Sequence, residues 1–201
     1  MKTLKIRITF QEELLGTSNS DAHLHEKYVA SKSPDAKNIA EEVEALGVDN
    51  VVSKGMTIFP KENGKPFVWD YQIQGFFKDS CGALARVKST RSSSIKAFKK
   101  IIGGLIFPQP RKIMLNLPEG SVIGTCQRPL RAATAQGERI ALANSETVPS
   151  GTTMDVDLKL LDDSDKHQKL IVEWLDYGAL RGMGGWRSSG KGRFTYEILK
   201  G

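Results

Sequence analysis

The chain has 201 residues, of which 39% are hydrophobic and 26% charged, and its net charge is +6 at pH 7. This composition argues against a disordered or fibrous protein and suffices for a buried core. No stretch approaches the roughly 20 apolar residues of a membrane helix, and residues 1–10 lack the apolar core of a signal peptide. We therefore expect a cytoplasmic protein without a membrane partner.

Two cysteines, Cys81 and Cys126, are too few for a disulfide framework or a zinc site, and we expect both to be buried and reduced. We also expect no metal and no cofactor. The positive charge favours an anionic partner, of which nucleic acid is the commonest.

The first predicted element is a strand over residues 3–10, where polar and apolar side chains alternate. Residues 16–35 are rich in Ser, Asn, Asp and Lys and predict a long loop. A short helix is predicted over residues 38–46, where the apolar positions share one face and Gly47 follows.

The next predicted element is an inserted hairpin, because the turn pair Asn63–Gly64 lies between the apolar runs 57–59 and 66–69. Two helices follow. The first covers residues 76–86, and the second covers residues 94–102 with its lysines facing outward.

Period-two alternation returns at residues 112–117 and 156–161 and predicts two further strands. Residues 121–143 between them show only short strand-like pieces, broken by glycines and by Pro129. The chain then predicts a helix over residues 165–180, a dense glycine segment and a last strand over residues 193–199.

The glycine segment reads GMGGWRSSGKGRF and resembles the C-terminal signature of the RAMP superfamily, the RNA-binding proteins of CRISPR effector complexes. The residues that match the pattern are Gly184, Gly185, Ser188 or Ser189, Gly190, Gly192 and Arg193. The opening stretch LKIRITFQEELLGTS is similar to the first strand of this family and the loop after it.

A third stretch, YQIQGFFKDSCGALARV, is similar to the start of the first long helix in the backbone subunits of that family. The corresponding positions are Ile73, Gly75, Lys78, Gly82, Leu84 and Arg86. The proline and paired serines that the family has there are replaced by Gln74, Phe76 and Phe77.

The resemblance implies an α+β fold: a ferredoxin-like or RRM-like antiparallel sheet with helices on one face, an inserted hairpin and a C-terminal glycine-rich loop. It implies one domain over residues 1–201 with insertions at residues 17–70 and 118–152. The resemblance extends to solitary copies encoded by bacteriophages, which implies a phage protein directed against a host defence complex in the bacterial cytoplasm.

Two segments form the candidate nucleic-acid interface. In the glycine-rich loop, backbone freedom and positive charge occur together, as phosphate contact requires; the alternative is a turn that packs the last helix on the sheet. The predicted loop contacts are Gly184, Gly185, Trp186, Arg187, Ser189, Gly190, Lys191, Gly192 and Arg193.

The second segment is rich in Lys and Arg, which predicts contacts with phosphates; its alternative role is a solvent-exposed helix face. Its predicted contacts are Lys78, Lys88, Arg91, Lys96, Lys99, Lys100, Arg111 and Lys112.

Three functions remain open at this stage. The first is a module that binds single-stranded RNA, or a CRISPR-type ribonucleoprotein, without catalysis. The second is an RNA endonuclease in which His23 or His25 transfers protons, or Asp21 supports a metal-assisted cut. The third is a structural protein that assembles head to tail. We favour binding, because the His and Asp cluster lies in a polar loop with nothing visible to hold it in place.

Overall fold

The computed structural model describes residues 1–19, 56–134, 137–161 and 165–199. The chain forms two compact units. The first unit comprises Met1–Leu14, Pro60–Val122 and Val148–Gly201, and the second comprises Leu15–Phe59 and Ile123–Thr147. The single domain with two insertions stays a prediction.

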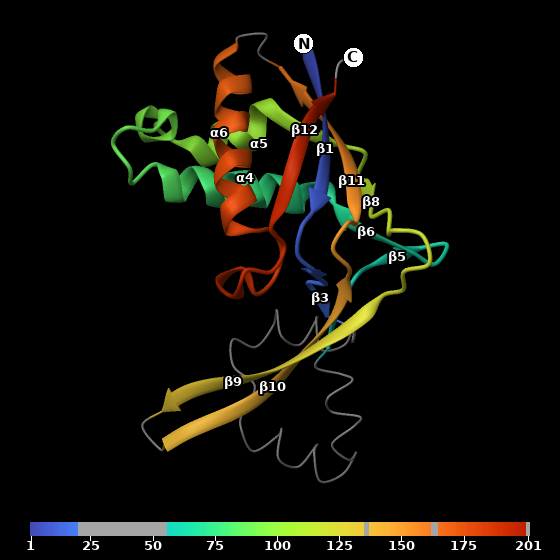
Figure 1. Ribbon diagram of the computed structural model, residues 1–201. Coiled ribbons are helices and arrows are strands. Elements are labelled where there is room, and N and C mark those ends of the chain that lie inside the picture. Colours follow the sequence, from blue (N-terminus) through green and yellow to red (C-terminus); the bar gives the residue numbers. More distant parts are fainter. Residues whose placement is uncertain (20–55, 135–136, 162–164, 200–201) are drawn as a thin grey trace. The chain divides into compact units, whose positions relative to one another are not determined.

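The first unit is built on a four-stranded antiparallel sheet in the order β12, β1, β11, β7, with helices against one face (Figure 1). In chain order this is the β-α-β-β-α-β connectivity of a ferredoxin-like fold, which confirms the predicted class. The first and last strands lie side by side, as expected. The elements are β1 (Lys2–Phe10), α4 (Asp70–Leu84), β7 (Ile106–Gln109), β11 (Thr153–Leu160), α6 (Asp165–Arg181) and β12 (Phe194–Leu199).

The two faces of this sheet follow the alternation in the sequence. β1 places Lys5 and Arg7 on the open face, while its apolar residues are buried on the other face. β11 runs antiparallel beside it, with Arg7 opposite Asp155 and Ile6 opposite Val156. The buried side chains of these two strands are Leu4, Ile6, Ile8, Phe10, Met154, Val156, Leu158 and Leu160.

Helix α4 begins at Asp70, so the predicted start at residue 76 is wrong. The Gln72 side chain accepts a hydrogen bond from the backbone N–H of Trp69 at 2.8 Å, which caps an earlier first turn. Phe76 and Phe77 consequently lie inside the helix, where both are buried. They serve the core in place of the serines that the RAMP family has at the helix start.

Trp174, in the middle of α6, organises the helical layer. Its ring lies 5.6 Å from that of Phe77 and is fully buried. Its indole Nε1 donates to Ser92 Oγ at 2.9 Å, and this hydroxyl donates to Glu173 at 2.6 Å. Buried Trp N–H groups need such partners. The contacts hold the 3-10 helix η1 (Arg91–Ser94) against α6.

The helix predicted over residues 94–102 is divided. Residues 91–94 form η1, and the α-helix α5 (Phe98–Leu105) begins only after Ala97, whose φ of 52° is left-handed. A left-handed residue cannot continue an α-helix. The start predicted at Ser94 is therefore wrong.

The Asn63–Gly64 turn is present, with φ of 50° and 77° at its two residues. It joins β5 (Lys61–Glu62) to β6 (Lys65–Trp69), which pairs on its other side with β8 (Lys112–Met114). The first arm predicted at residues 57–59 is wrong, because β4 (Thr57–Ile58) pairs instead with two strands of the second unit.

The second unit contains a long hairpin where only short strand pieces were predicted. β9 (Gly124–Thr134) and β10 (Gly137–Val148) pair from Thr147 opposite Gly124 to Gly137 opposite Thr134. Pro129 does not interrupt β9, because among the described strands β9 pairs with β10 alone, and proline is tolerated at such an edge. The remaining described strands are β2 (Leu14–Leu15) and β3 (Ser18–Asn19).

The thiols differ from each other. Cys81 is fully buried in α4, as predicted, and burial raises its pKa. Cys126 lies half-buried on β9, so its predicted burial is wrong.

The helix predicted over residues 38–46 lies outside the described residues. No helix in the described part of the chain is long and apolar enough to cross a membrane.

Candidate nucleic-acid interface

The glycine-rich loop between α6 and β12 has its two ends joined (Figure 1). The Met183 N–H donates to the Gly192 carbonyl at 2.9 Å, and the Gly192 N–H donates to the Glu13 carbonyl at 2.8 Å. Gly192 has a φ of 69°, and a side chain there would collide with the Met183 carbonyl oxygen. Glycine is therefore required for this close approach, and the loop is a fixed structure.

The middle of the loop bends through further left-handed residues. Gly184, Trp186 and Gly190 have φ of 76°, 54° and 81°. The 3-10 turn η2 (Arg187–Ser189) lies between them and is closed by hydrogen bonds from Ser189 and Gly190 N–H. Several amides are thus engaged within the chain, so contact with a phosphate falls mainly to the side chains. Gly184 and Ser189 are exposed, whereas Gly185 and Trp186 are half-buried.

The three cations of the loop differ in their surroundings. Arg187 forms an ion pair with Asp79 of α4, and Lys191 Nζ lies 2.7 Å from a carboxylate oxygen of Glu13. The Arg193 side chain is exposed, and its guanidinium has no hydrogen bond or ion pair with any residue that the structure describes. Arg193 is therefore the loop cation that is already available to an anion.

The basic segment is separated into two groups by the fold. Its first group surrounds η1 and α5 and consists of exposed lysines that have no carboxylate partner in the described ranges. These residues are Lys88, Lys96, Lys99 and Lys100. Lys78 of α4 is half-buried beside Gly103 of α5.

The second group lies at β7 and β8, where both cations have partners. The Arg111 guanidinium lies 5.3 Å from the centroid of the Trp69 ring. Lys112 Nζ lies 2.6 Å from a carboxylate oxygen of Glu62 and 5.6 Å from the centroid of the Phe67 ring. The structure thus does not bring the whole predicted segment, residues 88–112, into one uniform patch.

Two cations that the sequence reasoning missed lie beside Arg91. Lys166 and Lys169 are exposed on the first turns of α6 and line a shallow hollow together with Arg91 and Ser94. Their spacing of three residues on a predicted helix was the available signal, since such positions are neighbours on one face. Arg91 itself is held by its backbone N–H, which donates to Glu173 at 2.7 Å.

The open face of the sheet carries charges that neutralise one another. The Arg7 guanidinium donates to both carboxylate oxygens of Asp155, at 2.8 and 2.7 Å. Lys5 lies opposite Asp157, and Arg7 also lies opposite Glu197 of β12. The Arg7 contact lowers the pKa of Asp155, with its hydrogen bond as the main cause. A balanced face of this kind attracts polyanions weakly.

The catalytic candidates His23, His25 and Asp21 lie outside the described residues. The remaining histidine, His167, is buried in α6. Within the described ranges, no group of three His, Cys, Asp or Glu residues could hold a metal ion.

No known family model matches the sequence, and no curated protein matches it. The fold does have solved counterparts. A chain in the cryo-EM structure of the Type III-B Cmr-beta bound to cognate target RNA is 11% identical, with a TM-score of 0.58 over 99% of this chain and 61% of that chain. A chain of a Type IV-B CRISPR complex is 12% identical, with a TM-score of 0.47 over 100% of this chain and 93% of that chain.

The likeness to the Cmr-beta chain shows the fold. The chain spans about 61% of the length of the Cmr-beta chain that it matches. Both neighbours are chains of CRISPR complexes, and the sequence identity to them is low. The α+β ferredoxin-like fold expected from the RAMP resemblance is therefore the fold of this protein.

Proposed function

We propose that the protein is a RAMP-like module that binds single-stranded RNA, alone or within a CRISPR-type ribonucleoprotein. The glycine-rich loop and the lysines around η1 and α5 form the binding surface. The exposed guanidinium of Arg193, which has no ion-pair partner among the described residues and lies on a fixed loop, carries the proposal. The likeness to a chain of a complex bound to target RNA supports it through the fold. A role against a phage-targeting defence complex and head-to-tail assembly stay predictions.

Binding would begin at cations that need not release a partner. Arg193 and the lysines of the first basic group can meet phosphates directly, and condensed counterions leave the RNA as they do so. Lys191 and Arg187 can follow by exchanging their carboxylate partners for phosphate oxygens. Such contacts fix the position of the RNA backbone and carry no sequence information.

The open face of the sheet is not part of the proposed surface. RRM-type domains read bases on this face with aromatic side chains. Here the described strands present charge pairs, and Phe107 on the edge strand β7 is the exposed aromatic among them. The proposed mode of binding therefore uses the loop and the helical layer.

The proposal is tested by binding a labelled, unstructured RNA to the full chain at salt concentrations from about 50 to 300 mM, a range over which phosphate contacts weaken strongly. Changing Lys191 and Arg193 together to Ala should reduce the magnitude of the negative slope of log K against log salt by about 1.4, or about 0.7 for each lost contact. All RNA sequences should weaken about equally.

A matched control removes two positive charges elsewhere. Lys5 and Lys159 lie on the open face, so changing both to Ala should leave the slope nearly unchanged. An equal loss in the two double variants, or unchanged binding in the loop variant with the fold intact, would contradict the proposal.

The same incubations separate binder from enzyme. End-labelled RNA should be shifted in a gel and stay intact with and without divalent metal. Cleavage that is lost in His23→Ala or His25→Ala would favour the endonuclease. Metal-dependent cleavage that is lost in Asp21→Ala would favour the metal-assisted cutter.

A further inference from the structure

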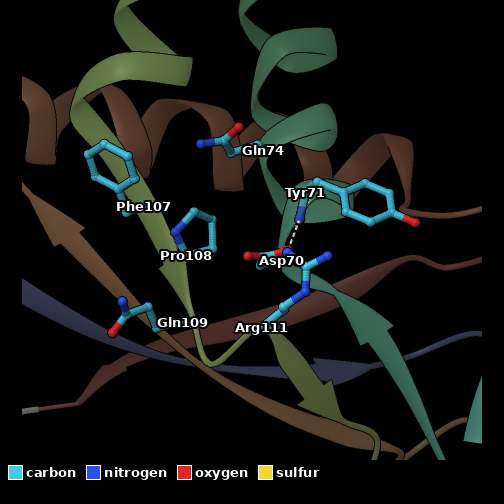
Figure 2. A pocket seen from close by; sticks show the side chains of 7 residues that line it. All are labelled: Asp70, Tyr71, Gln74, Phe107, Pro108, Gln109 and Arg111. Atoms are coloured by element: carbon cyan, nitrogen blue, oxygen red, sulfur yellow. Dashed lines mark hydrogen bonds between the residues drawn. The ribbon is translucent and has the colours of Figure 1, made fainter.

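A pocket that shares no residue with the glycine-rich loop lies where the start of α4 meets the edge strand β7 (Figure 2). Its volume is about 320 Å³, at the lower end of the range for small-molecule sites. The pocket is lined by Asp70, Tyr71, Gln74, Phe107, Pro108, Gln109 and Arg111.

One wall is an aromatic side chain with a rigid support. The rings of Trp69 and Tyr71 are stacked at 6.2 Å with planes 14° apart, and Phe67 meets Trp69 edge to face at 4.8 Å. Phe67 is buried, whereas the Tyr71 side chain is 57% exposed. The tyrosine is therefore held in place from within and still presents much of its ring to solvent.

A second exposed aromatic residue lies at the other side of the pocket. Phe107 projects from β7 with 38% of its surface exposed, and Figure 2 shows it across the pocket from Tyr71. Apolar surface that gathers at one place marks binding sites, and two exposed aromatic residues at one pocket offer it to a flat apolar ligand.

The remaining lining residues supply polar groups in fixed positions. The Arg111 guanidinium is oriented by its contact with the Trp69 ring. The Gln74 amide donates to the Ile106 carbonyl at 2.9 Å, and Asp70 accepts from the Tyr71 N–H at 2.8 Å. These contacts leave acceptor oxygens on Gln74 and Asp70 for a ligand, since a carboxylate and an amide oxygen each accept several hydrogen bonds.

We propose that this pocket holds one unstacked nucleobase of the bound strand. The base lies on the exposed ring of Tyr71, its amino edge faces Asp70 and Gln74, and its phosphate meets Arg111. A flat ring system with hydrogen-bond donors on its edge and an anion attached combines the three chemistries that the pocket offers. The inference rests on the proposed RNA binding and adds a base-dependent contact to it.

The test compares an unstructured RNA with the same strand made abasic, both bound to the full chain. Tyr71→Ala should weaken the normal strand about 5- to 150-fold, the range for loss of one base-stacking aromatic side chain. It should leave the abasic strand unchanged, and the salt slope should not move because no charge is lost. Tyr71→Phe keeps a ring and should bind like the parent protein.

The outcomes separate this inference from the function on which it rests. Normal RNA binding by Tyr71→Ala would overturn the pocket and leave the loop proposal standing, whereas failure of the parent protein to bind either strand would overturn both. If Tyr71→Ala weakened the binding of the normal and abasic strands equally, Tyr71 would have a structural role. If the variant lost self-association while RNA binding stayed intact, Tyr71 would serve a protein contact. Either result would overturn the proposed base pocket.

Crosslinking of RNA that contains 6-thioguanosine, a photoreactive base that keeps its amino group, to the unmodified protein gives a check that requires no variant. Crosslinks should map to Tyr71, Phe107 or their neighbours. Crosslinks confined to other segments would overturn the inference.

Discussion

The glycine-rich loop and the open face of the sheet both carry several charges, yet the charges are arranged differently. On the sheet, the strand register places Arg7 opposite Asp155, and the Arg7 guanidinium donates a hydrogen bond to each carboxylate oxygen of Asp155. On the loop, Lys191 forms an ion pair with Glu13, and the Arg193 guanidinium has no ion pair with any described residue. Positive charge is thus neutralised on one surface and left available on the other.

The comparison shows why a net charge of +6 locates no interface by itself. A polyanion responds to the cations that remain after internal pairing, because a paired cation must give up its partner first.

The largest effect should come from Gly192→Ala, which breaks the loop without changing any charge. The added Cβ would collide with the Met183 carbonyl, and the φ of 69° is unfavourable for alanine. We expect destabilisation of about 2 kcal/mol or more, together with loss of RNA binding. Chemical denaturation measures the first effect. Gly75→Ala, at a helical glycine with open space around it, is the matched control and should be tolerated.

The next largest effect should come from reversing one positive charge on the loop, compared with reversing one on the open face of the sheet. Arg193→Glu should weaken RNA binding about tenfold at low salt, because a favourable phosphate contact becomes repulsive. Arg7→Glu changes the net charge by the same amount on the open face and should have little effect. Fluorescence anisotropy measures the RNA affinity of both variants. A comparable loss of affinity in the two would show that the loop and the open face of the sheet contribute equally to RNA binding.

A gain of affinity is expected from Glu13→Gln. The substitution removes the carboxylate that holds Lys191, while the Glu13 backbone carbonyl that accepts from Gly192 remains. Lys191 then meets phosphate without giving up an ion pair, and affinity at low salt should rise about two- to fivefold. Unchanged affinity would mean that Lys191 does not contact the RNA.

The smallest effect concerns the Arg7 pair on the sheet. Arg7 lowers the pKa of Asp155 below its usual 3.8, so this pair stabilises the fold above that pH, and the contribution is lost as the pH falls through the lowered value. Arg7→Gln should therefore be slightly less stable than the parent protein at pH 7, and the difference should be smaller at pH 2. Both side chains are about half exposed, so the difference stays small. Thermal unfolding at the two pH values measures it, and RNA affinity should not change.

The sheet was the most predictable part of the molecule. Alternation in β1 and β11 reports directly which residues face the core, and the α6 stripe around Trp174 does the same for a helix. Element starts were less predictable, because the α4 start depends on a cap between Trp69 and Gln72 rather than on apolar spacing. Pro129 was misleading because only tertiary pairing reveals that β9 lies at an edge.

The sequence predicted which residue types form the candidate site, but it did not predict which of the charged side chains form ion pairs. The loop motif identified the cations, but the partner of Lys191 is Glu13, 178 residues away in the sequence. Tyr71, Phe107 and Arg111 likewise belong to different elements and share a pocket only after folding. No local pattern carries such information, because long-range contacts decide which side chains meet.

The position of β1 in the sheet also bears on synthesis. Its two neighbours, β11 and β12, come from residues 153–199, so β1 leaves the ribosome before either strand with which it pairs has been made. Such non-local pairing slows folding and leaves strand edges exposed meanwhile. The nascent β1 therefore stays unpaired, with an apolar face, until residues 153–199 have been made, which makes it a natural substrate for chaperones.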